Sequence, residues 1–412
     1  MRRTPKAFRL HIGLFGRRNA GKSSLLNALT HQQVSIVSKV AGTTTDPVEK
    51  PMEMLPLGPV LFIDTAGIDD VGALGAMRVS RTRQVIDRTD VALLVVAGGE
   101  FGSFEERLLE ALAAEKVPTI IVWNKADLGA PPPATIEAIA RRGIPTVSTV
   151  APEGRGVLQL REALIRTCPE EFVQTPPIVA DLVGPGELVV LVVPIDMEAP
   201  KGRLIQPQVQ TIRDLLDHDA CCMVVKDRDL RDALDRLRRP PALVVTDSQA
   251  FREVAAQTPP EVKLTSFSIL FARQKGDLGQ FVEGALAIDR LRPGDRVLIA
   301  EACTHHPIGD DIGRVKIPRW LNEHVGGPLE FVTLAGRDFP ADLERYRLVV
   351  HCGACMWNRR EVLSRMLRCR RAGVPMANYG MTIAYTLGIF ERALEPFPDA
   401  MATYRRLAVG AS

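Results

Sequence analysis

The glycine-rich pattern G-x-x-x-x-G-K-S near the start of the chain constrains its fold more than any other feature. It begins at Gly16, continues through Gly21 and Lys22, and ends at Ser23. The apolar run Leu10–Phe15 precedes it, and a helical pattern begins at Lys22. In a phosphate loop of this kind, backbone N–H groups surround the phosphates, the lysine neutralises their charge and the serine hydroxyl ligates Mg²⁺. The order strand, loop, helix therefore predicts an α/β domain that binds a nucleoside triphosphate.

Three later segments identify the base of that nucleotide. In chain order they are Asp64 with Gly67, Asn124 with Lys125 and Asp127, and Ser148 with Thr149. Asp64 ends an apolar run, as the aspartate that assists Mg²⁺ binding does, and Gly67 is the expected sensor of the γ-phosphate. The carboxylate of Asp127 can accept hydrogen bonds from N1 and N2 of guanine, which adenine does not offer. Together with the phosphate loop, these segments predict a GTPase.

We expect the phosphate loop and these segments to form one GTP site. Its residues are Gly16, Arg17, Asn19, Ala20, Gly21, Lys22, Ser23, Ser24, Asp64, Gly67, Asn124, Lys125, Asp127, Ser148 and Thr149. Ile68 stands where Ras-like GTPases place the glutamine that orients the attacking water. Because isoleucine cannot do this, another group must assist hydrolysis, and a bound monovalent cation could supply the charge stabilisation. Slow hydrolysis of this kind is typical of a switch.

Length and composition indicate a folded chain of several domains. With 412 residues, 46% hydrophobic and 25% charged, the sequence exceeds one ordinary domain and differs from disordered and fibrous chains. Its 52 basic and 49 acidic residues nearly cancel, so we expect no general attraction to nucleic acid or acidic lipid. The most apolar run, residues 188–195, is far shorter than a membrane span. Since 7 cysteines do not make a disulfide scaffold at this length, we expect a cytoplasmic protein.

Strand and helix patterns alternate through three α/β blocks, which predicts parallel sheets flanked by helices. We place the domains at residues 1–173, 174–274 and 275–412. Apolar, strand-like runs occupy residues 10–15, 60–63, 91–96 and 119–123 in the first, 188–195, 221–225, 242–245 and 262–271 in the second, and 296–300, 329–333 and 347–350 in the third. The sequence therefore predicts a nucleotide-binding domain followed by two further α/β domains.

Cysteine and histidine residues gather in two segments of the third domain. Cys303 and His305 follow its first predicted strand, and His351, Cys352 and Cys355 follow its last. Because parallel strands end at one edge of a sheet, we expect the two groups to meet there. Three thiolates suit either zinc or an iron–sulfur cluster, and they argue against magnesium or calcium. These residues alone leave the choice between zinc and iron open.

Around the nucleotide motifs, the first domain resembles the TrmE and Era branch of the translation-factor-related GTPases. Residues 42–46 read G-T-T-T-D where that branch has G-T-T-R-D, so Thr45 replaces the usual arginine. The spacing of Gly72, Gly75 and Arg78 resembles the segment after its second switch. Asn19 occupies the phosphate-loop position that ligates K⁺ in the potassium-activated members.

This resemblance implies roles for residues that the motifs alone do not assign. It implies that Thr44 ligates Mg²⁺ beside Ser23, and that hydrolysis is stimulated by K⁺. Thr44 thus joins Lys22, Ser23, Asp64 and Gly67, which the motifs assign, as an expected catalytic residue. The implied K⁺ ligands are Asn19, Ser38, Val40 and Thr43.

Over nearly its whole length the chain resembles the HydF family, the maturation GTPases of [FeFe]-hydrogenase. In the second domain the similar segments are residues 193–196 (V-P-I-D) and 199–205 (A-P-K-G-R-L-I). In the third they are residues 301–306 (E-A-C-T-H-H), 351–356 (H-C-G-A-C-M) and 378–380 (N-Y-G).

The resemblance to HydF implies an iron–sulfur scaffold. The family carries a [4Fe–4S] cluster, receives a two-iron precursor made with two radical-SAM maturases, and delivers it to apo-[FeFe]-hydrogenase. Cys303, Cys352 and Cys355 correspond to its cluster ligands, and His305 and His351 are candidates for the variable fourth ligand. The second domain corresponds to the dimerisation domain and the third to the cluster-binding domain. A homodimer, able to associate into a tetramer, is therefore expected.

The alternative reading is a TrmE- or Era-like regulatory GTPase that acts on RNA and carries a structural zinc domain. Such a protein should present a basic patch interleaved with aromatic side chains. An arginine-rich segment exists at Arg359–Arg371, but aromatic residues make up only 5% of the chain. We therefore do not expect a nucleic-acid partner.

Overall fold

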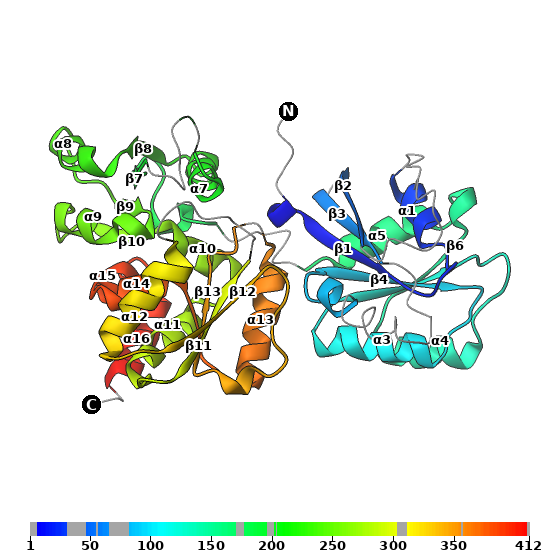
Figure 1. Cartoon of the computed structure of the whole chain (residues 1–412). Helices are drawn as coiled ribbons and strands as arrows, with labels where there is room; N and C mark the ends of the chain where they lie inside the picture. The colour runs from blue at the N-terminus through cyan, green and yellow to red at the C-terminus, as the bar shows by residue number, and fades with distance from the viewer. Residues whose placement is uncertain are drawn as a thin grey trace. The chain divides into compact units, whose positions relative to one another are not determined.

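The computed structural model describes residues 6–30, 47–54, 57–65, 82–169, 177–195, 202, 204–302, 311–355 and 357–409. The chain forms two compact units, Met1–Thr175 and Pro176–Ser412 (Figure 1). Both units are α/β, as the alternation of apolar runs predicts. The division falls within residues 174–177, a proline-containing segment that the sequence favours as a linker and of which only residue 177 is described.

The first unit is built on a six-stranded sheet with the order β2-β3-β1-β4-β5-β6. Its strands are β1 (Leu10–Phe15), β2 (Val48–Met54), β3 (Gly58–Asp64), β4 (Val91–Ala97), β5 (Thr119–Asn124) and β6 (Thr146–Thr149). All of them run parallel except β2, which pairs antiparallel with β3. The loops that follow β1, β3, β5 and β6 therefore leave the sheet at the same edge.

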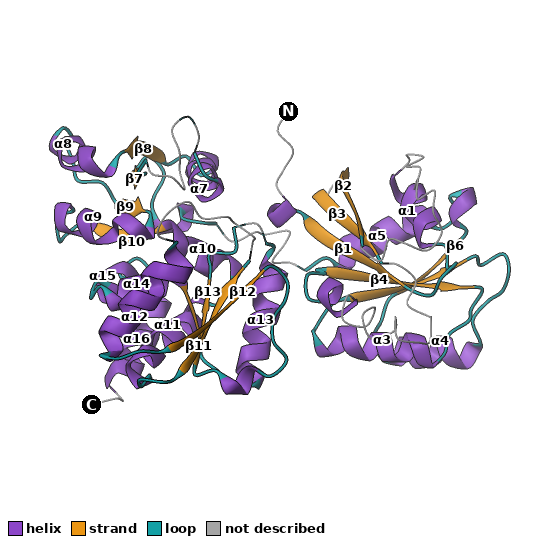
Figure 2. Ribbon diagram, viewed as in Figure 1, coloured by secondary structure: helices purple, strands orange, loops and turns teal. Residues whose placement is uncertain are grey.

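Helices cover both faces of this sheet (Figure 2). They are α1 (Lys22–Thr30), α3 (Ser103–Ala114), α4 (Pro133–Arg141) and α5 (Val157–Thr167). Side chains alternate between the faces along each strand. Thus Ile12 and Leu14 pack with the buried side of α1 and α5, whereas Phe15 packs with α3 and α4. The central strands β4 and β5 are largely apolar and buried on both faces, because helices cover both faces.

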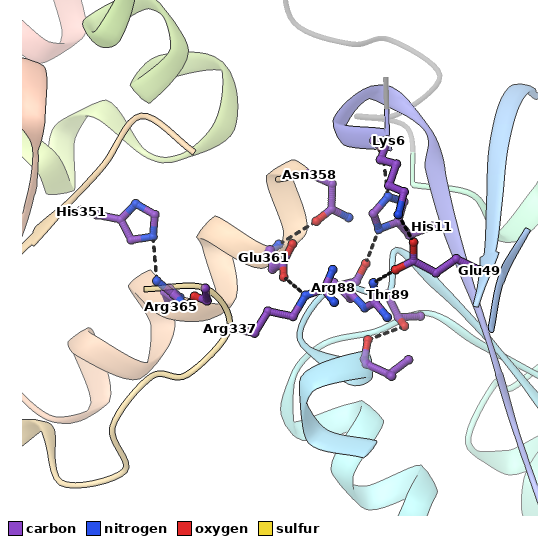
Figure 3. A network of polar contacts seen from close by, with 12 residues as sticks. Lys6, His11, Glu49, Arg88, Thr89, Arg337, His351, Asn358, Glu361 and Arg365 are labelled. Carbon is purple, nitrogen blue, oxygen red and sulfur yellow. Dashed lines mark hydrogen bonds and ion pairs between the residues drawn. The ribbon is translucent and has the colours of Figure 1, made fainter. Parts of the chain in front are cut away.

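A polar network, buried at His11 and Arg88, joins β1, β2 and the segment before β4 (Figure 3). Glu49 accepts hydrogen bonds from Lys6 and Arg88. Burial alone would raise the pKa of Glu49, but these two cations lower it to about 2. His11 contacts the carbonyl oxygens of Arg88 and Lys6 at 3.1 and 3.0 Å. Burial lowers the pKa of His11 to about 4, so its ring is neutral at pH 7.

The second unit contains two four-stranded sheets, with the orders β10-β9-β7-β8 and β12-β11-β13-β14. The strands are β7 (Leu188–Val192), β8 (Cys221–Val225), β9 (Leu243–Thr246), β10 (Lys263–Ser266), β11 (Arg296–Glu301), β12 (Glu330–Ala335), β13 (Leu348–His351) and β14 (Met376–Asn378). Every pairing in both sheets is parallel. Residues that follow β11 and β13 therefore share one edge of the second sheet.

The helices of the second unit surround both sheets. They are α7 (Gln206–Asp217), α8 (Leu230–Asp235), α9 (Phe251–Gln257), α10 (Phe267–Lys275), α11 (Leu278–Leu286), α12 (Ile317–Val325), α13 (Arg359–Arg371), α14 (Tyr379–Thr386), α15 (Phe390–Leu394) and α16 (Pro398–Val409). Helix α10 packs against α7 beside the first sheet and against α13 and α14 beside the second. The two sheets are therefore joined through a shared helix.

The apolar run at residues 262–271, predicted as one strand, is divided in the structure between β10 and α10. Ser266 starts the helix, because its side chain accepts a hydrogen bond from the backbone N–H of Ile269. A serine that caps the first turn in this way ends the strand. No helix in the described part of the chain is long and apolar enough to cross a membrane.

Candidate nucleotide and cysteine sites

The phosphate loop joins β1 to α1 and requires glycine at both ends. Gly16 has φ +142°, and a Cβ there would lie 2.2 Å from a carbonyl oxygen of β4. Gly21 has φ +87°, and a Cβ there would lie 2.2 Å from Nδ2 of Asn124. The ammonium of Lys22 donates to the carbonyl oxygens of Gly16 and Arg17 at 2.9 and 2.8 Å. The lysine thus lies over the loop whose phosphates it is predicted to neutralise.

Ser23 and Asp64, the two predicted Mg²⁺ residues that the structure describes, are in direct contact. The hydroxyl of Ser23 donates to Oδ2 of Asp64 at 2.9 Å. The buried Oδ1 of Asp64 has no hydrogen-bond partner among the described residues. Burial raises the pKa of Asp64, against the hydrogen bond from Ser23 and the charge of Lys22. An orphaned carboxylate oxygen beside a serine hydroxyl fits the oxygen ligands that Mg²⁺ prefers.

Asn124 ties residues 124–127, the predicted guanine loop, to the phosphate loop. Its side chain is 1% exposed. Its Nδ2 donates to the carbonyl of Ala20 at 2.9 Å, and its Oδ1 accepts from Oγ1 of Thr149 at 3.0 Å and from the N–H of Ala151 at 3.4 Å. Both Asn124 and Thr149 are predicted GTP-site residues. In the structure their buried side chains bond to each other, and Asn124 also bonds to the phosphate loop at Ala20.

The side chains on the outer side of the guanine loop remain available for the base. Asp127 and Ser148 are exposed, and Lys125 is half-buried with φ +56°. The N–H of Ala126 donates to the carbonyl of Thr149 at 3.2 Å, which fixes the loop that carries Asp127. The assignment of Asp127 to guanine stays a prediction.

Arg17, a predicted GTP-site residue, is tied to a glutamate that the sequence analysis did not single out. Its Nε and Nη2 donate to Oε1 and Oε2 of Glu105 at 2.8 and 2.9 Å. Glu105 lies in the first turn of α3, is 1% exposed, and also accepts from the N–H of Gly102 at 2.9 Å. The guanidinium lies 5.3 Å from the ring centroid of Phe104. In the sequence, Glu105 looks like an ordinary acidic residue in the first turn of a helix. Its contact with Arg17, 88 residues away, becomes visible only in the fold.

The remaining predicted residues of the nucleotide site fall in two groups. Asn19, with φ +62°, buried Ala20 and exposed Ser24 lie in or just after the phosphate loop. Outside the described residues lie Ser38, Val40, Thr43, Thr44, Gly67 and Ile68. The Mg²⁺ role of Thr44 and the K⁺ site therefore stay predictions.

The predicted cysteine site lies at the edge of the second unit's second sheet. Ala300 of β11 lies opposite His351 of β13 in the parallel register. The N–H of Cys352 donates to the carbonyl of Ala300 at 3.0 Å, and the N–H of Ala302 donates to Sγ of Cys352 at 3.0 Å. Ala302 immediately precedes Cys303, which lies outside the described residues together with His305. The sheet thus brings the chain next to Cys303 up to the thiol of Cys352.

Burial and hydrogen bonding act in opposite directions on this thiol. Burial raises the pKa of Cys352, while hydrogen bonds from the backbone of Ala302 and Ala354 lower it. Hydrogen bonds to sulfur are one of the means by which proteins tune iron–sulfur clusters. No group of three potential metal ligands occurs within the described ranges. Two thiols on one loop, with that of Cys352 beside the residue that precedes Cys303, would supply part of the donor set of a thiolate-bound metal centre.

His351, a candidate fourth ligand, has both ring nitrogens engaged, and Figure 3 shows the contact with Arg365. Its Nδ1 lies 2.7 Å from the carbonyl oxygen of Cys352, and its Nε2 lies 3.2 Å from Nη1 of Arg365. Since arginine only donates, Nε2 accepts and Nδ1 carries the proton. Burial, then the charge of Arg365, lowers the pKa of His351 to about 3. To bind iron through Nε2, His351 would have to give up the contact with Arg365.

Comparison with known protein families gives three matches along the chain, first a GTPase family and then two further domains. Residues 11–125 match the 50S ribosome-binding GTPase family. Residues 178–276 match the hydrogen maturase F dimerization domain, and residues 279–396 match its tetramerization domain. These last two matches together span most of the second unit.

Curated relatives match a smaller part of the chain. The tRNA modification GTPase MnmE of Nitrosomonas europaea is 35% identical over 38% of this chain and 34% of its own length. The GTPase Der of Wolinella succinogenes is 34% identical over 38% of this chain and 35% of its own length. The chain thus spans about a third of the length of these relatives. With a GTPase domain of this type followed by both maturase F domains, the chain belongs to the HydF family of hydrogenase maturation GTPases.

Proposed function

We propose that this protein hydrolyses GTP and serves as an iron–sulfur scaffold and carrier for the two-iron precursor of the [FeFe]-hydrogenase active site. The observation that carries the proposal is the order of the three family matches together with the thiol of Cys352 beside the chain that leads to Cys303. The partners proposed are apo-[FeFe]-hydrogenase, the two radical-SAM maturases and further copies of this chain. Self-association is supported by the dimerization and tetramerization domains that the chain matches.

In the nucleotide site, each described residue has a distinct task. The ammonium of Lys22 neutralises phosphate charge, and Ser23 and Asp64 hold Mg²⁺. The bound ion supplies charge stabilisation at the phosphates when GTP is present. Asp127 reads guanine, and Asn124 keeps the guanine loop and the phosphate loop at a fixed separation. We further propose that K⁺ bound near Asn19 raises turnover, because no glutamine is present at position 68.

In the cysteine site, Cys303, Cys352 and Cys355 are proposed to hold a [4Fe–4S] cluster. The cluster supplies an iron that can accept and release cargo, provided that the fourth ligand is weak or exchangeable. The engagement of both ring nitrogens weighs against His351 as the fourth ligand, and His305 lies outside the described residues, so both histidines are tested. Thiolate donors and an N–H···S hydrogen bond fit such a cluster and also fit zinc, so metal content decides between them.

The test is anaerobic purification of the full chain, followed by iron, sulfide and zinc analysis and EPR spectroscopy. We expect iron and sulfide in the parent protein and their loss in Cys352→Ala and Cys355→Ala. Cys221→Ala is the matched control, because Cys221 is exposed on β8 in the other sheet of the unit. Stoichiometric zinc without iron would overturn the proposal, as would a Cys352→Ala variant that still activates apo-hydrogenase.

GTP hydrolysis should survive in all three cysteine variants, since its residues lie in the first unit. The RNA-directed alternative is not favoured by the two maturase F matches. Filter binding with tRNA and rRNA checks it directly. Tight, saturable RNA binding together with zinc would replace the scaffold proposal by that alternative.

A further inference from the structure

A buried lysine from helix α10 reaches the loop that carries both described cysteines. Lys275 is the last residue of α10, and it is 3% exposed. Its Nζ donates to the carbonyl oxygen of Ala354 at 2.7 Å and to that of Trp357 at 2.8 Å. Ala354 lies between Cys352 and Cys355, and Trp357 lies two residues after Cys355. The lysine therefore binds the backbone on both sides of Cys355.

The loop adopts a backbone conformation that needs such support. Ala354 has φ +49° and is 3% exposed. The left-handed region is unfavourable for an L-residue, because Cβ comes too close to the following carbonyl oxygen. Strain of this kind persists only where surrounding contacts hold it. The carbonyl of the strained residue is itself one of the two acceptors of Lys275.

A second contact, made by an arginine, ties the same two segments in the opposite direction. Nη1 of Arg359, the first residue of α13, donates to the carbonyl oxygens of Gln274 and Gly276 at 2.6 and 3.2 Å. Lys275, which lies between these two residues, donates to the loop that precedes α13. The end of α10 and the cysteine loop are thus held together from both sides.

The charge of Lys275 also interacts electrostatically with the two thiols. Carbonyl oxygens are neutral acceptors, so they satisfy the ammonium without neutralising it. Burial lowers the pKa of Lys275 to about 8, and the charges of Cys355, Cys352 and Glu361 act in the opposite direction. Glu361 already pairs with Arg337 at 3.0 Å. A buried charge is retained where it has a compensating partner, and thiolates on this loop would provide one.

We propose that Lys275 is a positioning residue for the cluster: it fixes the Cys352–Cys355 loop through two carbonyls and compensates the negative charge of the thiolate-bound cluster. The proposal deepens the proposed function and rests on it for the charge effect. The positioning effect is testable without metal. In this role Lys275, which lies next to the end of the dimerization-domain match at residue 276, supports the cysteine site in the following domain.

The test uses the full chain with three substitutions and one control. Lys275→Met removes the charge and both donors, Lys275→Gln removes the charge but keeps a donor, and Lys275→Arg keeps the charge. Lys316→Met is the matched control. Lys316, in the tetramerization-domain match, also contacts the dimerization-domain match, because its Nζ donates to Oε1 of Gln249 at 2.6 Å. Two properties are measured: hydrogen exchange of residues 352–358 in metal-free protein, and the reduction midpoint potential of the anaerobically purified cluster.

We expect Lys275→Met to speed exchange of the loop at least tenfold and to leave the β7 and β9 peptides unchanged. Removing a nearby positive charge disfavours reduction, so the midpoint potential of the Met and Gln variants should move to more negative values. A tenfold effect on the one-electron equilibrium corresponds to about 59 mV. Lys275→Arg should restore the potential, and Lys316→Met should change neither property.

The outcomes separate this proposal from the proposed function. A parent protein without iron or sulfide overturns the scaffold function and the charge role, while loop exchange still decides the positioning role. A parent with a cluster, whose Met and Gln variants keep the parental potential and exchange, overturns the assignment of Lys275. Should Lys275→Met not accumulate as folded protein, Lys275→Gln carries the same two measurements.

Discussion

Replacing Asn124 by alanine should destabilise the first unit, because this buried amide supports two loops at once. It makes two well-formed hydrogen bonds, with the carbonyl of Ala20 at 2.9 Å and with Oγ1 of Thr149 at 3.0 Å. The contact from the N–H of Ala151 is longer, at 3.4 Å, and contributes little to stability. Leaving a buried partner unsatisfied costs about 1–3 kcal/mol. Two bonds in one network are not fully additive, so we expect a loss of about 2–4 kcal/mol.

Hydrogen exchange of peptides from β4 and β5 measures this loss within the full chain. Where exchange requires unfolding of the unit, about 2–4 kcal/mol corresponds to roughly 30- to 700-fold faster exchange. Thr149→Val removes only one of the bonds and should cost about 1 kcal/mol. Thr146→Ala, at an exposed position on β6, is the control and should change stability by less than about 0.5 kcal/mol. Unchanged exchange in Asn124→Ala would refute the supporting role of this side chain.

Four further predictions follow from the two sites and from the polar network around His11. Asp127→Ala should weaken GTP binding by about 1–3 kcal/mol in calorimetry without changing exchange of the β5 peptide; an unchanged Kd would contradict its role in base recognition. K⁺ should raise GTP turnover above Na⁺ at equal ionic strength, and Asn19→Ala should abolish the difference; equal rates in both salts would remove the K⁺ site. Because burial lowers the pKa of His11 to about 4, the stability it contributes above its ordinary pKa of about 6.5 should be lost as pH falls towards 4. NMR of the ring should accordingly show no protonation of His11 at pH 6; titration near pH 6.5 would contradict it. His351→Ala should retain a cluster with an altered EPR signal, whereas Cys352→Ala should lose the cluster. Loss of the cluster in His351→Ala and its retention in Cys352→Ala would contradict the assignment of Cys352 as an essential ligand.

The α/β class and the order of the nucleotide motifs could be predicted because both follow from local patterns. A glycine-rich loop between an apolar run and a helix has few structural solutions, and Gly16 and Gly21 occupy positions where a Cβ would meet backbone or amide atoms. The pairing of β11 with β13 could also be anticipated, because both cysteine segments follow apolar runs. The structure places the chain before Cys303 beside Cys352 as that pattern suggests.

Other features depend on contacts between residues far apart in the sequence. Nothing near Lys275 marks it as different from other helix-terminal lysines, yet its partners lie about 80 residues away at Ala354 and Trp357. Hydrophobic pattern could not divide residues 262–271, since a short apolar run fits a strand and a buried helix equally well. The motif around His351 identified a potential ligand, but only its neighbours in the fold show that Arg365 already occupies Nε2.

The helix shared by the two sheets of the second unit limits how this protein can be shortened or recombined. Phe267, Leu270 and Phe271 of α10 are buried, and α10 packs on helices from both sides of the boundary between the two maturase F matches. A chain ended at residue 276 would leave part of that apolar surface in water, and one begun at 278 would lose the helix on which α13 and α14 pack. Expression of residues 176–412 as one piece avoids both exposures. The same geometry implies that, in evolution, either half could be exchanged for a relative's only together with a matching α10.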